Sequence, residues 1–173
     1  FALLLLWTLT PALPFMHRHS GETRAWFLDV GQGDSILVEF EDGKTLLVDT
    51  GLGNDPMPGA ESGRLLAALE REGVRPDDID MVVITHLHGD HVGWNLREDL
   101  PERPLSFPNA RYRVHEADWN HFTTEELLSD EYRGEHTRRS VLPIHERGVL
   151  DLMDGETELA PGVPRELAKL VKR

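Results

Sequence analysis

The stretch Thr85-His86-Leu87-His88-Gly89-Asp90-His91 decides how the rest of this sequence is interpreted. It places three of the chain's nine histidines and one aspartate within six positions, a density that points to a ligand cluster. Side chains two residues apart in an extended backbone lie on the same face, so His86 and His88 point in the same direction. Asp90 and His91 follow one short turn later. Imidazole and carboxylate are ligands that Zn²⁺, Fe²⁺ or Mn²⁺ accept, so the stretch predicts a site for two neighbouring metal ions.

Hydrophobic patterns around this stretch predict an α/β fold. Residues 79–85 form a nearly continuous apolar run, which is typical of a strand buried on both faces. Residues 64–72 place leucines on one face and end before Gly73, as an amphipathic helix does. Further strands are expected over 24–30, 35–40, 45–48, 109–115 and 149–153, and further helices over 116–122, 125–132 and 164–172. The ligand candidates then follow the carboxyl end of a strand, where layered α/β proteins bind ligands.

Composition narrows the classes of partner and of metal ligand. The 173 residues are 39% hydrophobic, which is enough for one domain with a core. The 31 acidic and 18 basic residues give a formal net charge of −13, which repels phosphate backbones and argues against a nucleic-acid partner. The sequence contains no cysteine, so a metal must be held by imidazole and carboxylate groups rather than by thiolates.

The first twenty residues differ from the rest of the chain. Residues 1–16 are apolar except for two threonines, and two prolines interrupt them. The run is shorter than the roughly 20 apolar residues that a spanning helix needs. We expect residues 1–20 to be the truncated end of a membrane or signal segment, or else an apolar arm, and residues 21–173 to form the domain. The first alternative predicts membrane contact through residues 1–16 and an extracytoplasmic or membrane-attached protein, and the second predicts a cytoplasmic one.

The histidine-rich stretch resembles the signature of metallo-β-lactamase-fold hydrolases. The likeness extends back through residues 27–34 and 47–51. The resemblance implies a metallo-β-lactamase-like αβ/βα sandwich, of which this chain carries the first half and a short carboxyl-terminal helix. It also implies two divalent metal ions as cofactors, with zinc expected and iron or manganese as alternatives.

The same resemblance gives the residues their roles. It implies that His86 and His88 bind the first ion, and that Asp90 and His91 bind the second. Asp90 would also be catalytic, because it would orient a zinc-bound hydroxide and could pass a proton to the leaving group. Asp49 would support the metal loop from the preceding strand rather than bind metal. The alternative for Asp49 is a plain turn-capping role.

Two branches of this family compete. Residues 30–34 and the apolar start resemble the carboxyl-terminal domain of competence DNA-uptake proteins, which predicts a nuclease. Residues 93–95, 107–112 and 116–119 resemble lactonases and organophosphate hydrolases. His88 completes the ligand run and the charge is acidic, and both favour the second branch. The expected function is therefore metal-dependent hydrolysis of a small ester, lactone or phosphoester.

The likeness to the family ends before its later metal ligands. In the family, a further histidine follows a Pro-Gly-Val strand by about a dozen residues, and a bridging aspartate and a last histidine come later. Here residues 161–163 match that tripeptide, and the chain ends at Arg173. We therefore expect weakened metal binding and reduced or absent activity. A third alternative is a non-catalytic half-domain that binds metal weakly or forms a homodimer. The histidines that could substitute in principle, although surface or structural roles are expected for each, are His115, His121, His136 and His145.

Overall fold

The structure is a computed structural model that describes residues 21–53 and 64–154. The predicted apolar arm or membrane segment and the predicted helix over 164–172 lie outside the described residues, so both stay predictions, as do the membrane contact and the compartment. Within the described ranges, no helix is long and apolar enough to cross a membrane.

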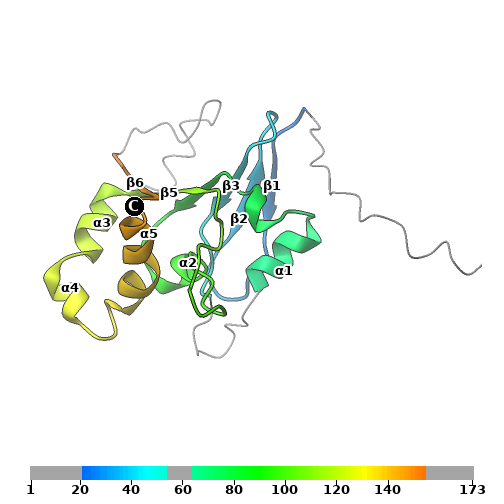
Figure 1. Ribbon diagram of the computed structural model, residues 1–173. Helices are drawn as coiled ribbons and strands as arrows, with labels where there is room; N and C mark the ends of the chain where they lie inside the picture. Colours follow the sequence, from blue (N-terminus) through cyan, green and yellow to red (C-terminus); the bar gives the residue numbers. More distant parts are fainter. Residues whose placement is uncertain (1–20, 54–63, 155–173) are drawn as a thin grey trace, which may run out of the picture.

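One six-stranded sheet forms the centre of the molecule, with its strands side by side in chain order (Figure 1). The first two pairings are antiparallel and the other three are parallel. The strands are β1 (Arg24–Phe27), β2 (Ile36–Glu39), β3 (Thr45–Val48), β4 (Met81–Ile84), β5 (Arg111–His115) and β6 (Leu150–Met153). All six predicted strands are present, and five of them are shorter than predicted. The predicted α/β fold class is confirmed.

The apolar run of β4 reflects a strand that is buried on both faces. Val82 and Ile84 belong to the larger core, together with Leu47 and Tyr112 of the neighbouring strands. Val83 belongs to a smaller cluster on the opposite face. Side chains alternate across a strand, so only an unbroken apolar sequence can fill both clusters.

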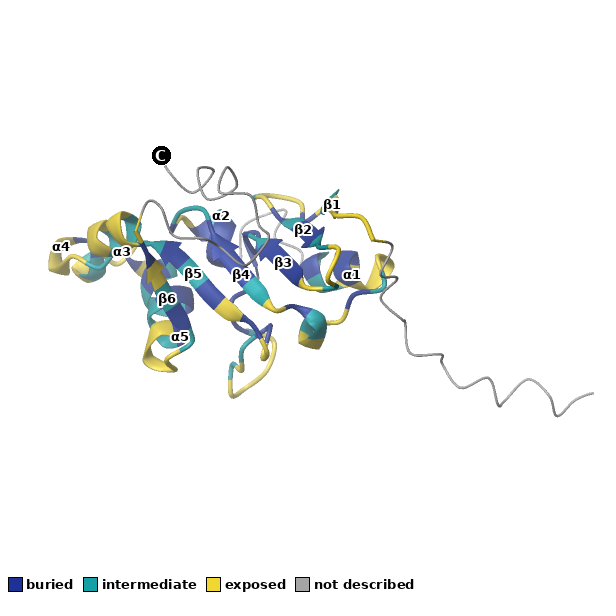
Figure 2. Cartoon of the chain, turned by 90° about the horizontal axis from the view of Figure 1, so that it is seen from above, coloured by how far each residue is buried: buried dark blue, intermediate teal, exposed yellow. Residues whose placement is uncertain are grey.

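The helices are short and pack mainly on one side and one end of the sheet (Figure 1). The α-helices are α1 (Arg64–Arg71), α2 (Gly89–Val92), α3 (Glu116–Phe122), α4 (Glu125–Ser129) and α5 (Leu142–Glu146). A 3-10 helix, η1 (Pro76–Asp78), precedes β4, and a π-helical turn, η2 (Thr137–Val141), precedes α5. Buried residues concentrate along β3, β4 and α2, whereas α4 is largely exposed (Figure 2).

The helix predictions were right for α1 and α3 and too long for α4. Thr124 begins α4 by accepting a hydrogen bond from the Leu127 amide, which satisfies a donor in the first turn. Asp130 has extended backbone angles, so α4 ends at Ser129, three residues before the predicted end at residue 132. The helices α2, η2 and α5 were not predicted, because each has only four or five residues and shows no helical periodicity.

Candidate metal centre

The parallel strands bring three chain segments to one edge of the sheet. Asp49 follows β3, Thr85 begins the histidine-rich stretch after β4, and α3 follows β5. Because the carboxyl ends of parallel strands meet at the same edge, residues far apart in the sequence become neighbours there. We call residues 85–91 the metal loop.

Glycines let the neighbouring loops approach the metal loop at backbone distance. A Cβ atom on Gly33 would lie 2.0 Å from the carbonyl oxygen of Asp90, and Gly33 has a φ of +92° that favours glycine. The Thr50 amide donates to the His91 carbonyl oxygen at 2.8 Å. The two segments that carried the family resemblance, 27–34 and 47–51, are therefore the backbone supports of the metal loop.

Asp49 is buried beneath the metal loop and connects three of its groups. Its Oδ1 accepts a hydrogen bond from the Thr85 amide at 2.7 Å. Its Oδ2 accepts from the Thr85 hydroxyl at 2.6 Å and lies 2.8 Å from Nδ1 of His91. Asp49 adopts a φ of +58°, a left-handed conformation that costs a non-glycine residue energy and that asparagine and aspartate tolerate best. Asp49 therefore holds both ends of the metal loop by hydrogen bonds, and its role toward a metal stays a prediction.

The four predicted ligands lie together at the carboxyl end of β4. The ring centroid of His86 lies 4.6 Å from that of His88 and 3.9 Å from that of His91. Nε2 of His91 lies 3.6 Å from Oδ1 of Asp90. The short turn expected after His88 is the helix α2, which begins at Gly89 and places Asp90 and His91 in its first turn. The local cluster seen in the sequence is therefore also a cluster in space.

The imidazole nitrogens and carboxylate oxygens of the metal loop are donor types that a divalent cation accepts, but they do not converge on one point. In the described part of the chain, no three imidazole or carboxylate groups are arranged closely enough to hold a metal ion. In the neutral form of His91, the Asp49 carboxylate only accepts a hydrogen bond, so the ring proton lies on Nδ1 and Nε2, 3.6 Å from Oδ1 of Asp90, is left to bind a cation. A carboxylate behind an imidazole is the arrangement that orients histidine ligands in metal sites.

The pKa values of two histidines of the metal loop are shifted in opposite directions. Burial lowers the pKa of His86, and the neighbouring imidazoles of His91 and His88 lower it further. For His91 burial also lowers the pKa, but the hydrogen bond and charge of Asp49, with the charge of Asp90, outweigh burial and leave the pKa raised. His86 is therefore available to a cation as neutral imidazole, whereas protons compete more strongly for His91.

Two side chains of helix α3 lie beside the histidines of the metal loop. The Phe122 ring lies 5.4 Å from the His88 ring in an edge-on arrangement. Asp118 is half-buried within electrostatic range of both His86 and His88, and its burial raises the pKa of its carboxyl group. Residues 116–119 resemble the lactonase branch, but the sequence pattern does not mark Asp118 or Phe122 as a site residue.

The other histidines have different surroundings. His115 begins α3 by accepting a hydrogen bond from the Ala117 amide. His145 stacks on Trp119 with ring centroids 4.4 Å apart, far from the metal loop in sequence and exposed to solvent. Neither of these two contacts involves a residue of the metal loop. His136 is the exception, because its ring lies against Gly89 of the metal loop.

Comparison with known proteins identifies the family. Residues 28–164 match the sequence profile of the metallo-beta-lactamase superfamily, which covers more than half of the chain. The chain belongs to the metallo-β-lactamase superfamily. The resemblance seen in the sequence is thereby confirmed.

Several superfamily members are similar to this chain at low identity. An N-acyl homoserine lactonase from Bacillus cereus is 25% identical over an alignment of 144 residues, and the match covers 73% of this chain and 49% of the relative. A probable metal-dependent hydrolase from Staphylococcus aureus matches with a TM-score of 0.63 at 19% identity, over 82% of this chain and 62% of its own. The dizinc quorum-quenching lactonase AidC matches with a TM-score of 0.54 at 21% identity, and the match covers 74% of this chain and 45% of AidC. The structural matches show the superfamily fold, and the chain spans about half the length of the curated relative.

Proposed function

We propose that this chain forms the metal-binding part of a metal-dependent hydrolase that acts on a small lactone, with related esters and phosphoesters as further substrates. The observation that carries the proposal is the bond between Asp49 and His91, which turns Nε2 of His91 toward Asp90 inside a group of three imidazoles. Membership of the superfamily supports hydrolysis, and the lactonase relatives support the lactone.

Each residue of the centre has a part in the proposed mechanism. His86 and His88 would hold one divalent ion, and Asp90 and His91 the other. Such ions, most suitably zinc for this donor set, supply positive charge that lets water act as a nucleophile near neutral pH. Asp90 would orient the attacking water, accept a proton from it as the water attacks, and then pass that proton to the leaving oxygen. Asp49 keeps the proton of His91 on Nδ1, away from the centre.

The test is hydrolysis by the purified full chain loaded with zinc, iron or manganese. We expect turnover of an N-acyl homoserine lactone at a reduced rate, which depends on the added metal and is lost in Asp90→Asn. Asp151→Asn is the matched control, because this aspartate pairs with Arg111 on the exposed end of the sheet. Metal bound without hydrolysis of a lactone, an ester or a phosphotriester would contradict the proposal.

A second candidate function is a non-catalytic half-domain that associates with a second copy. The observation in its favour is Phe27 at the end of β1, whose side chain is 83% exposed beside the apolar Ile36 of β2. An exposed aromatic residue on an edge strand favours association between chains. A sedimentation measurement that finds concentration-dependent dimers, together with no turnover, would favour this candidate.

The net charge of −13 weighs against the nuclease alternative.

A further inference from the structure

The hydroxyl group of Thr85 lies between a carboxylate and an imidazole. Its Oγ1 atom lies 2.6 Å from Oδ2 of Asp49 and 3.0 Å from Nδ1 of His86. A hydroxyl carries a single proton, so it can donate only one of these two hydrogen bonds and must accept the other. The partner that receives the hydroxyl proton therefore decides which ring nitrogen of His86 is protonated.

Asp49 is the partner that receives this proton. A carboxylate cannot donate a hydrogen bond, so a hydroxyl that donated to His86 would leave two oxygens 2.6 Å apart with no proton between them. An O–H group that donates to a carboxylate forms a bond of about 2.5–2.7 Å, which is roughly twice as strong as a bond between neutral groups. Burial lowers the pKa of His86, so its ring is neutral at neutral pH and carries one proton. That proton lies on Nδ1, which donates it to the oxygen of Thr85.

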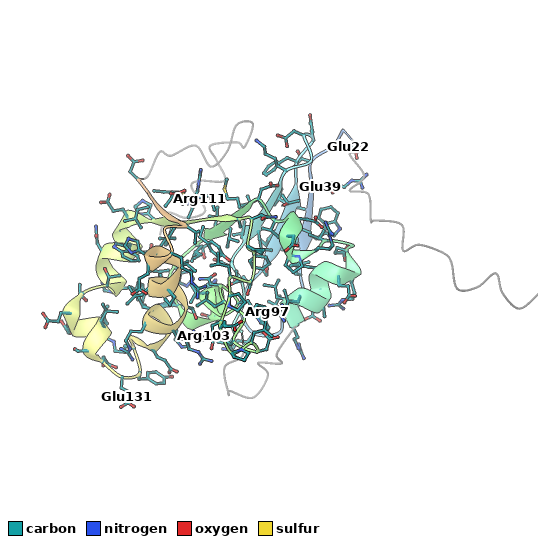
Figure 3. The ribbon with its side chains drawn as sticks, in the orientation of Figure 1. Glu22, Glu39, Arg97, Arg103, Arg111 and Glu131 are labelled. Atoms are coloured by element: carbon teal, nitrogen blue, oxygen red, sulfur yellow. The ribbon has the colours of Figure 1, made fainter. Side chains whose placement is uncertain are left out.

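The Asp49 carboxylate has no competing cation among the residues that the structure describes. Within those residues it forms no ion pair with a lysine or an arginine, and His91 is its one ion-pair partner. Arg97 and Arg103, in the loop that follows α2 (Figure 3), pair with carboxylates of their own loop. One buried carboxylate therefore orients the ring of His91 directly and reaches His86 through the hydroxyl of Thr85.

We propose that Thr85 is a positioning residue, whose hydroxyl connects Asp49 to His86 and holds the ring proton of His86 on Nδ1. A neutral imidazole can carry its proton on either nitrogen, and the hydrogen bond at one nitrogen decides which of them is left to bind a cation. Here Nε2 of His86 is left unprotonated, as it is in the neutral form of His91. The consequence for metal binding rests on the proposed function, whereas the place of the proton is a property of the metal-free chain.

The test locates the ring proton by NMR on the metal-free full chain, from spectra that correlate ring nitrogens with carbon-bound ring hydrogens. The signals of His86 are assigned by their loss in His86→Gln. Thr85→Val keeps the branched shape of the side chain and removes the hydroxyl, and Thr85→Ser keeps the hydroxyl. Thr45→Val is the matched control, because this buried hydroxyl contacts the carboxylate of Asp80 at the other end of β3. We expect the proton on Nδ1 in the wild type, Thr85→Ser and Thr45→Val, and partly or wholly on Nε2 in Thr85→Val.

The place of the proton separates positioning from packing. A wild-type ring protonated on Nε2, or a ring proton that stays on Nδ1 in Thr85→Val, would overturn the inference. Competition with a chelator should show that Thr85→Val binds zinc about tenfold more weakly or worse, and that Thr45→Val binds it like the wild type. A wild-type chain that binds no zinc would overturn the proposed function, while the NMR spectra still decide the inference. If circular dichroism shows that Thr85→Val does not fold, Asp49→Asn serves instead and should move the ring protons of both His86 and His91.

Discussion

Replacing Asp49 with asparagine tests how the fold prepares the metal loop. The substitution keeps the shape of the side chain, and asparagine tolerates the left-handed φ of +58° as well as aspartate does. It replaces a carboxylate, which only accepts hydrogen bonds, by an amide, which also donates. If the amide NH2 faces His91, it donates to Nδ1, and the proton of the ring moves to Nε2. That nitrogen can then no longer bind a cation.

The size of the effect follows from the three contacts of Asp49. The side-chain oxygen of asparagine can keep the hydrogen bond from the Thr85 amide. The Thr85 hydroxyl, which donates to Asp49, can instead accept from the asparagine NH2. The lost charge-assisted bonds should lower the free energy of unfolding by about 1–3 kcal/mol. Metal affinity should fall by about 10–100-fold, the usual effect of losing the carboxylate behind an imidazole ligand. That factor corresponds to about 1.4–2.8 kcal/mol of binding free energy.

Two measurements give both quantities. Urea unfolding of the metal-free chain followed by circular dichroism gives the stability, and chelator competition gives the affinity. Asp42→Asn is the control, because its carboxylate also accepts a backbone hydrogen bond, from the Lys44 amide, but in an exposed turn. The reasoning is refuted if Asp49→Asn binds metal as tightly as the wild type.

Three further predictions concern the supports of the centre. Gly33→Ala should lower the free energy of unfolding by about 1–3 kcal/mol more than Gly148→Ala, since both have positive φ but only Gly33 meets a backbone atom, the Asp90 carbonyl oxygen; equal losses in urea unfolding would contradict this. Glu98→Gln should cost about 1–3 kcal/mol, because this shielded carboxylate pairs with Arg103 and Arg139, whereas Asp99→Asn should cost about 0–1 kcal/mol for its exposed pair with Arg97; the two melting curves test the difference. Because the pKa of His91 is raised, its protonated form stabilises the metal-free chain below the ordinary histidine pKa of about 6.5, and this contribution is lost as pH rises through the raised value. Metal affinity should fall as pH decreases through the same window, and an affinity that does not change with pH would show that His91 is not a ligand.

The sheet could be predicted because its signals are local. The runs that became β3 and β4 are apolar on both faces, and Asp42-Gly43 marks the turn before β3. The strand ends were less predictable: the run over 79–85 pairs only from Met81 to Ile84, because Ile79 joins the core after η1 and Thr85 turns toward Asp49.

The site could be predicted only where its residues are neighbours in the sequence. His86, His88, Asp90 and His91 form one motif, so the sequence alone places them together. Asp118 and His136 lie more than 25 residues away, and only the packing of α3 and η2 brings them to the metal loop. The π-helical turn beside His136 has no pattern in the sequence that distinguishes it from an ordinary short helix.

The central claim is that residues 86–91 hold metal ions, and metal content per chain tests it most directly. We would measure zinc, iron and manganese by elemental analysis on the purified full chain and on His86→Ala with His88→Ala. The account predicts about two equivalents of metal in the wild type and loss of metal in the double variant. Metal-free wild-type protein that also fails to take up added zinc would contradict it, as would equal metal content in both proteins.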